Sequence, residues 1–168
     1  MRMATTTTFK VKFRRRREGK TNYAKRLALL LSGKPRLGVR KSNRYVYLQI
    51  IEFNKQGDKT SVQANSKELE NFGWKRGKRN TPSAYLTGLL CGARAKKKNI
   101  SECILDIGFN SSVSGSVCFA ALKGALDSGL KIPFDEKAMP KEERLLGLHM
   151  DNGLKQTVEK IKKEILEG

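Results

Sequence analysis

The sequence predicts an α+β fold with α/β character. A three-stranded antiparallel meander plus one parallel strand form a mixed sheet, which is packed with helices. Alternating apolar and polar residues occupy most of residues 36–65, and turn-forming residues interrupt them twice. A helix, a short apolar strand and another helix follow over residues 81–129. A strand that is reached through a crossover helix joins its sheet in parallel.

The N-terminal part of the chain is predicted to be a basic extension followed by a helix. Residues 1–19 contain too few core-forming residues to fold alone. The next segment, TNYAKRLALLLSGKP, has the pattern of a helix that Thr21 or Asn22 caps and that Gly33 and Pro35 end. Its apolar stripe comprises Leu27, Leu30 and Leu31.

Two turns divide the predicted meander into three strands. Ser42-Asn43 separates the first two strands, because Asn tolerates the left-handed conformation of a tight hairpin turn. Gln56-Gly57-Asp58 turns the chain into a third, shorter strand within KTSVQANS. The alternating apolar positions of the first two strands are Leu37, Val39, Val46, Leu48 and Ile50.

A second helix is predicted from Thr81, with Thr81 as its N-cap and Pro82 at the first helical position. Gly88 and Gly92 lie one turn apart, which indicates close packing of this helix against the sheet. Its buried face is predicted to comprise Tyr85, Leu86, Leu89, Leu90 and Ala93.

The last part of the chain contains a strand, two helices and an extended segment. The apolar run CILDI, residues 103–107, is the fourth strand, and the loop GFNSSVSGS leads into a helix over residues 117–128. Residues 131–153 contain two prolines and resemble an extended wrap, and residues 154–167 form a charged terminal helix. We therefore expect three parts: a basic extension, a globular RNA-binding domain and a C-terminal wrap with its helix, over residues 1–19, 20–130 and 131–168.

The positive charge is concentrated in one half of the chain. Of the net charge of +19, residues 1–44 contribute +14 and residues 45–98 contribute +7, whereas residues 99–168 contribute −2. Lysine and arginine that neutralise phosphates release condensed counterions, so this asymmetry indicates a nucleic-acid partner. A membrane surface is the weaker alternative, since residues 10–20 offer only Val11 and Phe13 as large apolar residues.

Catalysis, metal binding and cofactor binding have little support in the sequence. His149 is the only histidine, no Cys-x-x-Cys is present, and no Walker or Rossmann spacing occurs. We interpret Asp106, in the predicted fourth strand, as a structural residue and not a catalytic one. Cys91, Cys103 and Cys118 lie in apolar runs, which predicts buried free thiols in a reducing compartment. We therefore expect a cytoplasmic protein without enzymatic activity, cofactor or membrane segment.

Several segments carry residue types suited to RNA. The hairpin tip VRKSNRY gathers cations on a tight turn, which favours contact with phosphate. The alternative is an ordinary solvated surface turn. The residues SSVSGS precede a helix N-terminus that could bind phosphate, and ordinary capping by Ser114 or Ser116 is equally compatible. Phe13 and Tyr23 could stack on bases or serve as packing anchors.

The order of these motifs resembles one family. The stretch KVKFRRRREGKTNYAKRLALLLSGKPRLGVRKSNRYVYLQI is similar to the N-terminal half of the 5S-rRNA-binding protein of the large ribosomal subunit. This family is called L-eighteen in bacteria and archaea and L-five in eukaryotes. The resemblance continues through NTPSAYLTGLLCGARA, ILDIGF, FAALKGALDSGLKIP and ERLLGLHM. The basic extension and the tail PFDEKAMP to GLHM resemble archaeal and eukaryotic members. No long insertion lies between Asn99 and Cys103, which favours the archaeal form.

This resemblance implies a fold of the translational-machinery type and a structural role on the ribosome. It implies binding of 5S rRNA and its docking onto large-subunit rRNA in the central protuberance, beside another protein that binds 5S rRNA. A small RNA-processing enzyme or a nonspecific RNA chaperone is the alternative function. The predicted RNA-binding residues are Lys10, Lys12, Phe13, Arg14, Arg15, Arg16, Arg17, Lys20, Thr21, Tyr23, Arg26, Arg36, Arg40, Lys41, Ser42, Asn43, Arg44, Ser114, Gly115 and Ser116.

Overall fold

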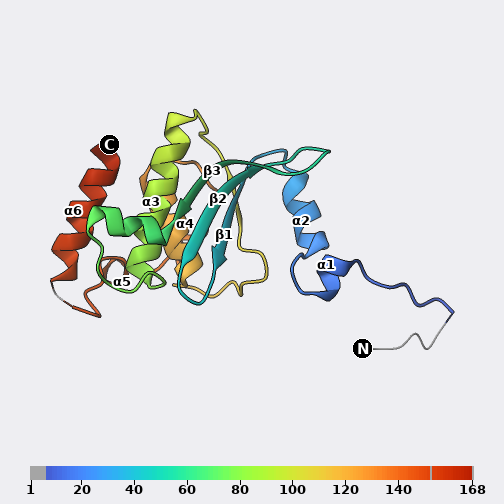
Figure 1. Ribbon diagram of the computed structural model, residues 1–168, viewed down its shortest axis with the longest axis horizontal. Helices are drawn as coiled ribbons and strands as arrows, with labels where there is room; N and C mark the ends of the chain where they lie inside the picture. Colours follow the sequence, from blue (N-terminus) through green and yellow to red (C-terminus); the bar gives the residue numbers. More distant parts are fainter. Residues whose placement is uncertain (1–6, 152, 168) are drawn as a thin grey trace.

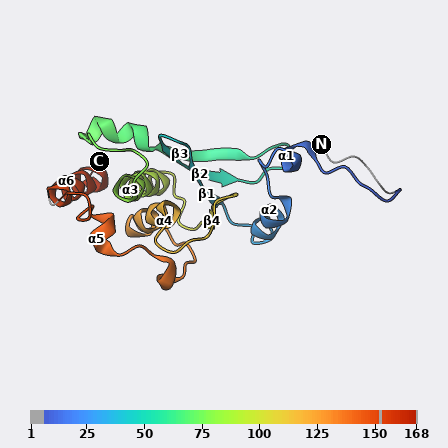
Figure 2. The ribbon, with the colours of Figure 1, turned by 90° about the horizontal axis from the view of Figure 1, so that it is seen from below.

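Four strands form one mixed sheet in the order β3-β2-β1-β4 (Figures 1 and 2). They are β1 (Arg36–Lys41), β2 (Val46–Glu52), β3 (Lys59–Asn65) and β4 (Ile104–Asp106). The pairs β1–β2 and β2–β3 are antiparallel, and β4 joins β1 in parallel. The computed structural model, which describes residues 7–151 and 153–167, thus confirms the predicted meander with a parallel fourth strand.

The strands alternate between a buried face and a polar face. The apolar positions predicted from the alternation are fully buried: Leu37, Val39, Val46, Leu48 and Ile50. Their neighbours Arg36, Gly38 and Arg40 in β1 point to the other side, because successive side chains of a strand face opposite ways. We call this other side, which also carries Tyr47, the open face. It is this alternation that separates the hydrophobic core from the charged residues.

Two helices cover the buried face of the sheet, α3 (Thr81–Lys97) and α4 (Val117–Asp127) (Figure 2). The side chain of Asn80 accepts a hydrogen bond from the backbone N–H of Ser83 and caps α3. The expected cap at Thr81 was therefore wrong by one residue, because the amide oxygen of Asn80 reaches the free N–H group first. Thr81 instead begins the helix.

Glycines bring α3 and α4 into close contact. A Cβ on Gly88 would lie 2.1 Å from the carbonyl oxygen of Ala121, and one on Gly124 would lie 2.0 Å from that of Tyr85. A Cβ on Gly92 would meet the hydroxyl of Ser128. Gly88 and Gly92 thus pack against α4, and the expectation that they face the sheet was wrong. Glycine spacing signals a close approach but does not say which element approaches.

The turn between β1 and β2 is wider than expected. Lys41 pairs with Val46, so residues 42–45 all belong to the turn. The hydroxyl of Ser42 accepts from the N–H of Tyr45 at 3.0 Å, and the N–H of Ser42 donates to the Tyr45 carbonyl at 2.8 Å. Among the described residues other than glycine, only Asn99 has a positive φ, so Asn43 does not adopt the predicted left-handed conformation. The Ser42 side chain closes the turn instead.

The C-terminal part of the chain returns to the helical layer. The 3-10 helix η2 (Glu136–Ala138) and the short helix α5 (Glu142–Leu145) lie in the predicted wrap, and α6 (Leu154–Glu167) follows as predicted. The helix α6 packs beside α3, on the side away from the sheet (Figures 1 and 2). Its buried residues recur every three or four positions: Leu154, Val158, Ile161 and Ile165. This single apolar stripe explains why a strongly charged helix is held to the domain.

The segment between β3 and α3 was not assigned from the sequence. It begins with the 3-10 helix η1 (Ser66–Phe72), which Asn65 and Glu68 cap reciprocally. Trp74 follows and is 1% exposed. Its indole N–H donates to the carbonyl of Gly77 at 3.1 Å, so this tryptophan fixes the chain that leads into α3.

The N-terminal helices contrast with this packed layer. The helices α1 (Arg14–Arg17) and α2 (Tyr23–Leu30) lie at the end of the molecule away from α6 and contain no buried residue (Figure 1). Asn22 caps α2, as predicted. Leu27 and Leu31 of the predicted apolar stripe are 61% and 80% exposed. The helix forms where the sequence predicts it, but its apolar stripe meets little of the domain.

All three cysteines are free thiols in the core, as predicted. Burial raises the pKa of Cys91 to about 12 and that of Cys103 to about 11, and it also raises the pKa of Cys118. Among the helices that the structure describes, none has the length and apolarity needed to span a membrane.

Candidate nucleic-acid interface

A cationic pocket of about 170 Å³ opens where the N-terminal helices meet the open face of the sheet. Two carboxylates, Asp58 and Asp106, lie among six cationic side chains in its lining. The cationic residues are Arg15, Lys20, Lys25, Arg26, Arg36 and Arg40. We call this site the anion pocket, because its excess of four positive charges favours a negatively charged ligand.

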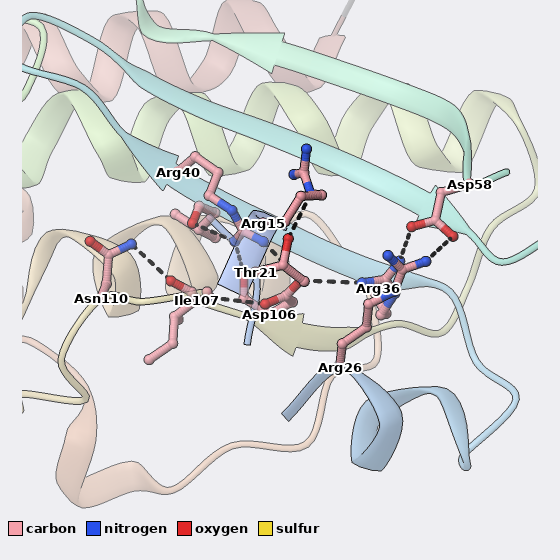
Figure 3. Close-up of polar contacts among 11 residues, drawn as sticks. Arg15, Thr21, Arg26, Arg36, Arg40, Asp58, Asp106, Ile107 and Asn110 are labelled. Atoms are coloured by element: carbon pink, nitrogen blue, oxygen red, sulfur yellow. Dashed lines mark hydrogen bonds and ion pairs between the residues drawn. The ribbon is translucent and has the colours of Figure 1, made fainter. Parts of the chain in front are cut away.

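Asp106 holds two of these arginines in place (Figure 3). The parallel register pairs Asp106 with Gly38, which lies between Arg36 and Arg40 on the same face of β1. One carboxylate oxygen, Oδ2, accepts from Arg40 Nη2 at 2.9 Å and from Arg36 Nη1 at 3.4 Å. Asp106 is therefore a structural residue of the pocket, in agreement with the sequence interpretation.

Asp58 forms a second bridge, between the sheet and α2. Its Oδ2 accepts from Arg36 Nη2 at 2.6 Å, and its Oδ1 accepts from Arg26 Nη2 at 3.0 Å (Figure 3). Asp58 comes from the turn between β2 and β3, so this contact ties three parts of the chain together. Guanidinium groups held by carboxylates lose little conformational entropy when they bind a further ligand.

Gly108 allows the guanidinium of Arg40 to approach the loop after β4 closely. Its φ is +61°, and a Cβ at this position would lie 2.9 Å from Cζ of Arg40. The N–H of Gly108 donates to Oδ1 of Asp106 at 2.9 Å, while Arg40 Nη1 donates to the Asp106 carbonyl at 2.7 Å. Both the guanidinium and the loop are therefore fixed by the same aspartate.

Arg36 is the most deeply placed cation of the pocket. It is 4% exposed, and its two terminal nitrogens are taken by Asp58 and Asp106. Its Nε is buried and has no acceptor among the described residues. Arg36 was predicted to bind RNA, and in this structure its exposed area is small. Most of the accessible charge is therefore presented by the exposed cations of the pocket, Arg15, Lys20, Lys25 and Arg40.

The arm, which we define as residues 7–22, reaches the pocket through its first helical turn. Arg15 Nε donates to Oγ1 of Thr21 at 2.9 Å. The rings of Phe13 and Tyr23 pack at 5.4 Å between centroids, so they serve as packing partners of each other. The side chains of Lys10, Lys12, Arg14, Arg16 and Arg17 are exposed. Four neighbouring arginines in one helical turn repel one another, and polyanion binding would relieve this repulsion.

Apart from Arg40, the hairpin tip lies outside the pocket lining. Lys41, Ser42, Asn43 and Arg44 are all exposed in the structure. Among the described residues, Lys41 and Arg44 have no carboxylate within ion-pair distance. Their charges are therefore available to a partner.

The loop before α4 is tied to the C-terminal wrap. The hydroxyl of Ser114 donates to the carbonyl of Lys137 at 2.7 Å, and the N–H of Gly115 donates to that of Ala138 at 2.9 Å. Ser116 is the N-cap residue of α4, but its side chain makes no capping hydrogen bond. Capping by a serine hydroxyl, one of the two interpretations of this loop, is thus absent from this described loop. The three residues lie apart from the anion pocket.

Sequence reasoning missed part of this surface. Lys25 and Asp58 line the anion pocket, and only the fold brings them to the other cations. Residues 75–80, KRGKRN, come to lie beside the hairpin tip. The sequence shows four cations within residues 75–79, and this density could have indicated a candidate RNA-binding segment. In residues 7–151 and 153–167, no cluster of histidine, cysteine or carboxylate side chains has the makeup of a metal site.

The comparisons with known proteins all point to the same family. The sequence profile of the family described as "Ribosomal large subunit proteins 60S L5, and 50S L18" matches residues 7–101 and 95–135. Large ribosomal subunit protein uL18 of Korarchaeum cryptofilum is 53% identical over 148 residues, which cover 88% of this chain and 76% of the relative. The protein of that name from Methanococcus maripaludis is 48% identical over 165 residues, or 96% of this chain and 86% of the relative.

Proposed function

Since the chain belongs to the family of large-subunit ribosomal proteins that includes uL18, we propose that it binds 5S rRNA and docks it onto large-subunit rRNA in the central protuberance. Family membership makes the chain a structural constituent of the large ribosomal subunit in the cytoplasm, not an enzyme. Ribosomal RNA and other ribosomal proteins are its partners. The choice of 5S rRNA, and of a neighbouring protein that also binds it, belongs to the proposal.

The anion pocket is the observation that carries the proposal. Six cations surround two carboxylates, and each carboxylate bridges two arginines. Asp106 bridges two arginines of β1, and Asp58 bridges one of them to Arg26 of α2. Arginine recognises phosphate with a rigid fork of donors, and pre-positioned guanidinium groups bind it at low entropic cost. The pocket is therefore suited to a phosphate of an RNA backbone whose path is fixed relative to the sheet.

The arm and the hairpin tip extend this surface in two directions. Phosphate contacts fix the register of a protein on RNA, whereas specificity comes from shape and from base contacts. We assign contacts with the RNA phosphate backbone to the exposed cations of the arm. The arm would then lie between 5S rRNA and large-subunit rRNA. We assign recognition of RNA shape to the hairpin tip, from Arg40 to Arg44. Ser114, Gly115 and Ser116 belong to the same proposed interface.

A binding experiment with a charge-matched control tests this proposal. The triple variant Arg14→Ala, Arg16→Ala and Arg17→Ala should bind 5S rRNA at least about tenfold more weakly at 0.1 M salt, since each lost phosphate contact lowers the log–log salt slope by about 0.7 to 0.9. The control, Lys155→Ala, Lys160→Ala and Lys163→Ala, removes the same charge from exposed positions of α6 and should stay within about twofold.

Competition with transfer RNA shows whether the protein recognises 5S rRNA specifically. Wild-type protein should prefer 5S rRNA to transfer RNA at equal salt, and its 5S complex should associate with large-subunit rRNA in a pull-down. Equal affinity for both small RNAs, or a 5S complex that fails to join large-subunit rRNA, would contradict the proposal.

A further inference from the structure

A second basic surface lies between the hairpin tip and the segment before α3. The groove has a volume of about 600 Å³ and is lined by residues 43–45 and 76–80. Four of its lining residues are cationic, Arg44, Arg76, Lys78 and Arg79, and its lining contains no carboxylate. It shares no lining residue with the anion pocket. We call it the tip groove.

Both walls of the tip groove are held rigidly. On one wall, the buried Trp74 donates to the Gly77 carbonyl, and Asn80 caps α3, so the segment between them is fixed at both ends. On the other wall, the Ser42 side chain closes the turn between β1 and β2. Charges on rigid walls are pre-positioned, which reduces the entropic cost of binding. The positive end of the α3 dipole adds to the local field.

The cations of the tip groove differ in how far they are already neutralised. Arg76 Nη2 lies 2.6 Å from Oδ2 of Asp151, and Lys78 pairs with Glu70. Arg44 and Arg79 are exposed, and no described carboxylate lies within ion-pair distance of either. These two guanidinium groups come from different walls, so a bound anion between them would contact both segments.

We propose that the tip groove binds the phosphate backbone of ribosomal RNA, through Arg44 and Arg79, independently of the arm. This inference rests on the proposed function and extends it from Arg44, which the sequence already predicted, to Arg79 and the segment before α3, which lie outside the predicted interface. The chemistry favours RNA over an acidic protein, because protein interfaces have an apolar core and Tyr45 is the only aromatic residue in the lining. Lys78 lies 5.6 Å from the Tyr45 ring centroid and orients this side chain.

The position of the groove explains how it can act separately from the anion pocket. The anion pocket follows β1 from Arg36 to Arg40, and the groove begins beyond the end of this strand, at Asn43. The groove also adjoins the start of α3 at Asn80, whereas the anion pocket adjoins α1 and α2. The protein thus has two phosphate-binding surfaces on a single rigid sheet.

The double variant Arg44→Glu and Arg79→Glu tests the inference in the full chain. We expect binding to 5S rRNA, to large-subunit rRNA or to both to weaken at least about tenfold at 0.1 M salt, and the salt slope for that RNA to fall by about 1.4 to 1.8. The matched control is Lys155→Glu and Lys163→Glu, which makes the same change of charge on α6. Thermal unfolding should be unchanged in both variants, since all four side chains are exposed.

Combining this double variant with the arm variant, Arg14→Ala, Arg16→Ala and Arg17→Ala, shows whether the arm and the groove contact separate phosphates or the same ones. If the arm and the groove contact separate phosphates, the losses in binding free energy of the two variants should add. Affinities equal to those of the control for both RNAs would overturn the inference and leave the proposed function intact. If wild-type protein itself shows no preference for 5S rRNA over transfer RNA, the proposed function fails, whatever the groove variant does.

Discussion

On one face of the sheet, Leu37 and Val39 are fully buried beneath α3 and α4, whereas on the other face Arg36 and Arg40 of the same strand meet Asp106. Apolar contacts and close helix packing hold the first face to α3 and α4. On the second face, a few ion pairs hold the neighbouring segments together, and many cations there are exposed. Stability should therefore depend on the packed face and RNA affinity on the cationic one. Variants that affect only one property, or both, test this division.

Deletion of residues 1–19 should have the largest effect, and only on RNA binding. If three or more of the arm cations contact phosphates, the log–log salt slope should fall by at least about 2, with a loss of about 100-fold or more in affinity at 0.1 M salt. Thermal unfolding should be unchanged, because α1 has no buried residue. Salt titrations of rRNA binding measure the slope, and an unchanged slope would mean that the arm does not contact RNA.

Gly124→Ala should have the next largest effect, and only on stability. The new Cβ would lie 2.0 Å from the Tyr85 carbonyl oxygen, so α3 and α4 must separate. Overpacking of this kind should lower the free energy of unfolding by about 3 kcal/mol. Denaturant unfolding measures it, with Gly77→Ala as the control because the nearest atom there is 3.7 Å away. Equal stability of the two variants would show that α3 and α4 are not in close contact.

Asp106→Asn should affect both properties, because Asp106 lies where the two regions meet. Arg36 would keep Asp58 but lose its second carboxylate, and Arg40 would lose its ion pair. We expect a loss of about 2 to 3 kcal/mol in stability, since a nearly buried charge loses a partner. Binding to rRNA should also weaken, because Arg40 is no longer fixed. Glu136→Gln, at an exposed position, is the control.

This last case shows what the sequence could and could not predict. The alternation in residues 36–65 was sufficient for the meander, and the apolar run at residues 103–107 for the fourth strand. The register that pairs Asp106 with Gly38 is a long-range property, and no local pattern encodes it. Arg40 was predicted to be an exposed cation, and it is half exposed, but the sequence did not predict its ion pair with Asp106. A charge reversal at Arg40 would therefore confound RNA binding with stability, and Arg44 is the cleaner position.

The segment before α3 shows a second limit. Trp74 and the basic residues 75–79 were visible in the sequence, but their position beside the hairpin tip depends on how α3 crosses the sheet. The division into residues 1–19, 20–130 and 131–168, and the predicted RNA-binding residues, remain predictions. The pocket brings together six of those residues: Arg15, Lys20, Thr21, Arg26, Arg36 and Arg40.

Leu31→Ala should have the smallest effect and sets the boundary of the packed region. Leu31 is 80% exposed, so its removal should change the free energy of unfolding by less than about 0.5 kcal/mol. Leu89→Ala, at a fully buried position of α3, should cost about 3 kcal/mol because it leaves a cavity. Denaturant unfolding of both variants gives the comparison. A loss above about 1.5 kcal/mol for Leu31→Ala would mean that α2 packs against the domain in solution, and the stabilising contacts would then extend to the cationic side of the molecule.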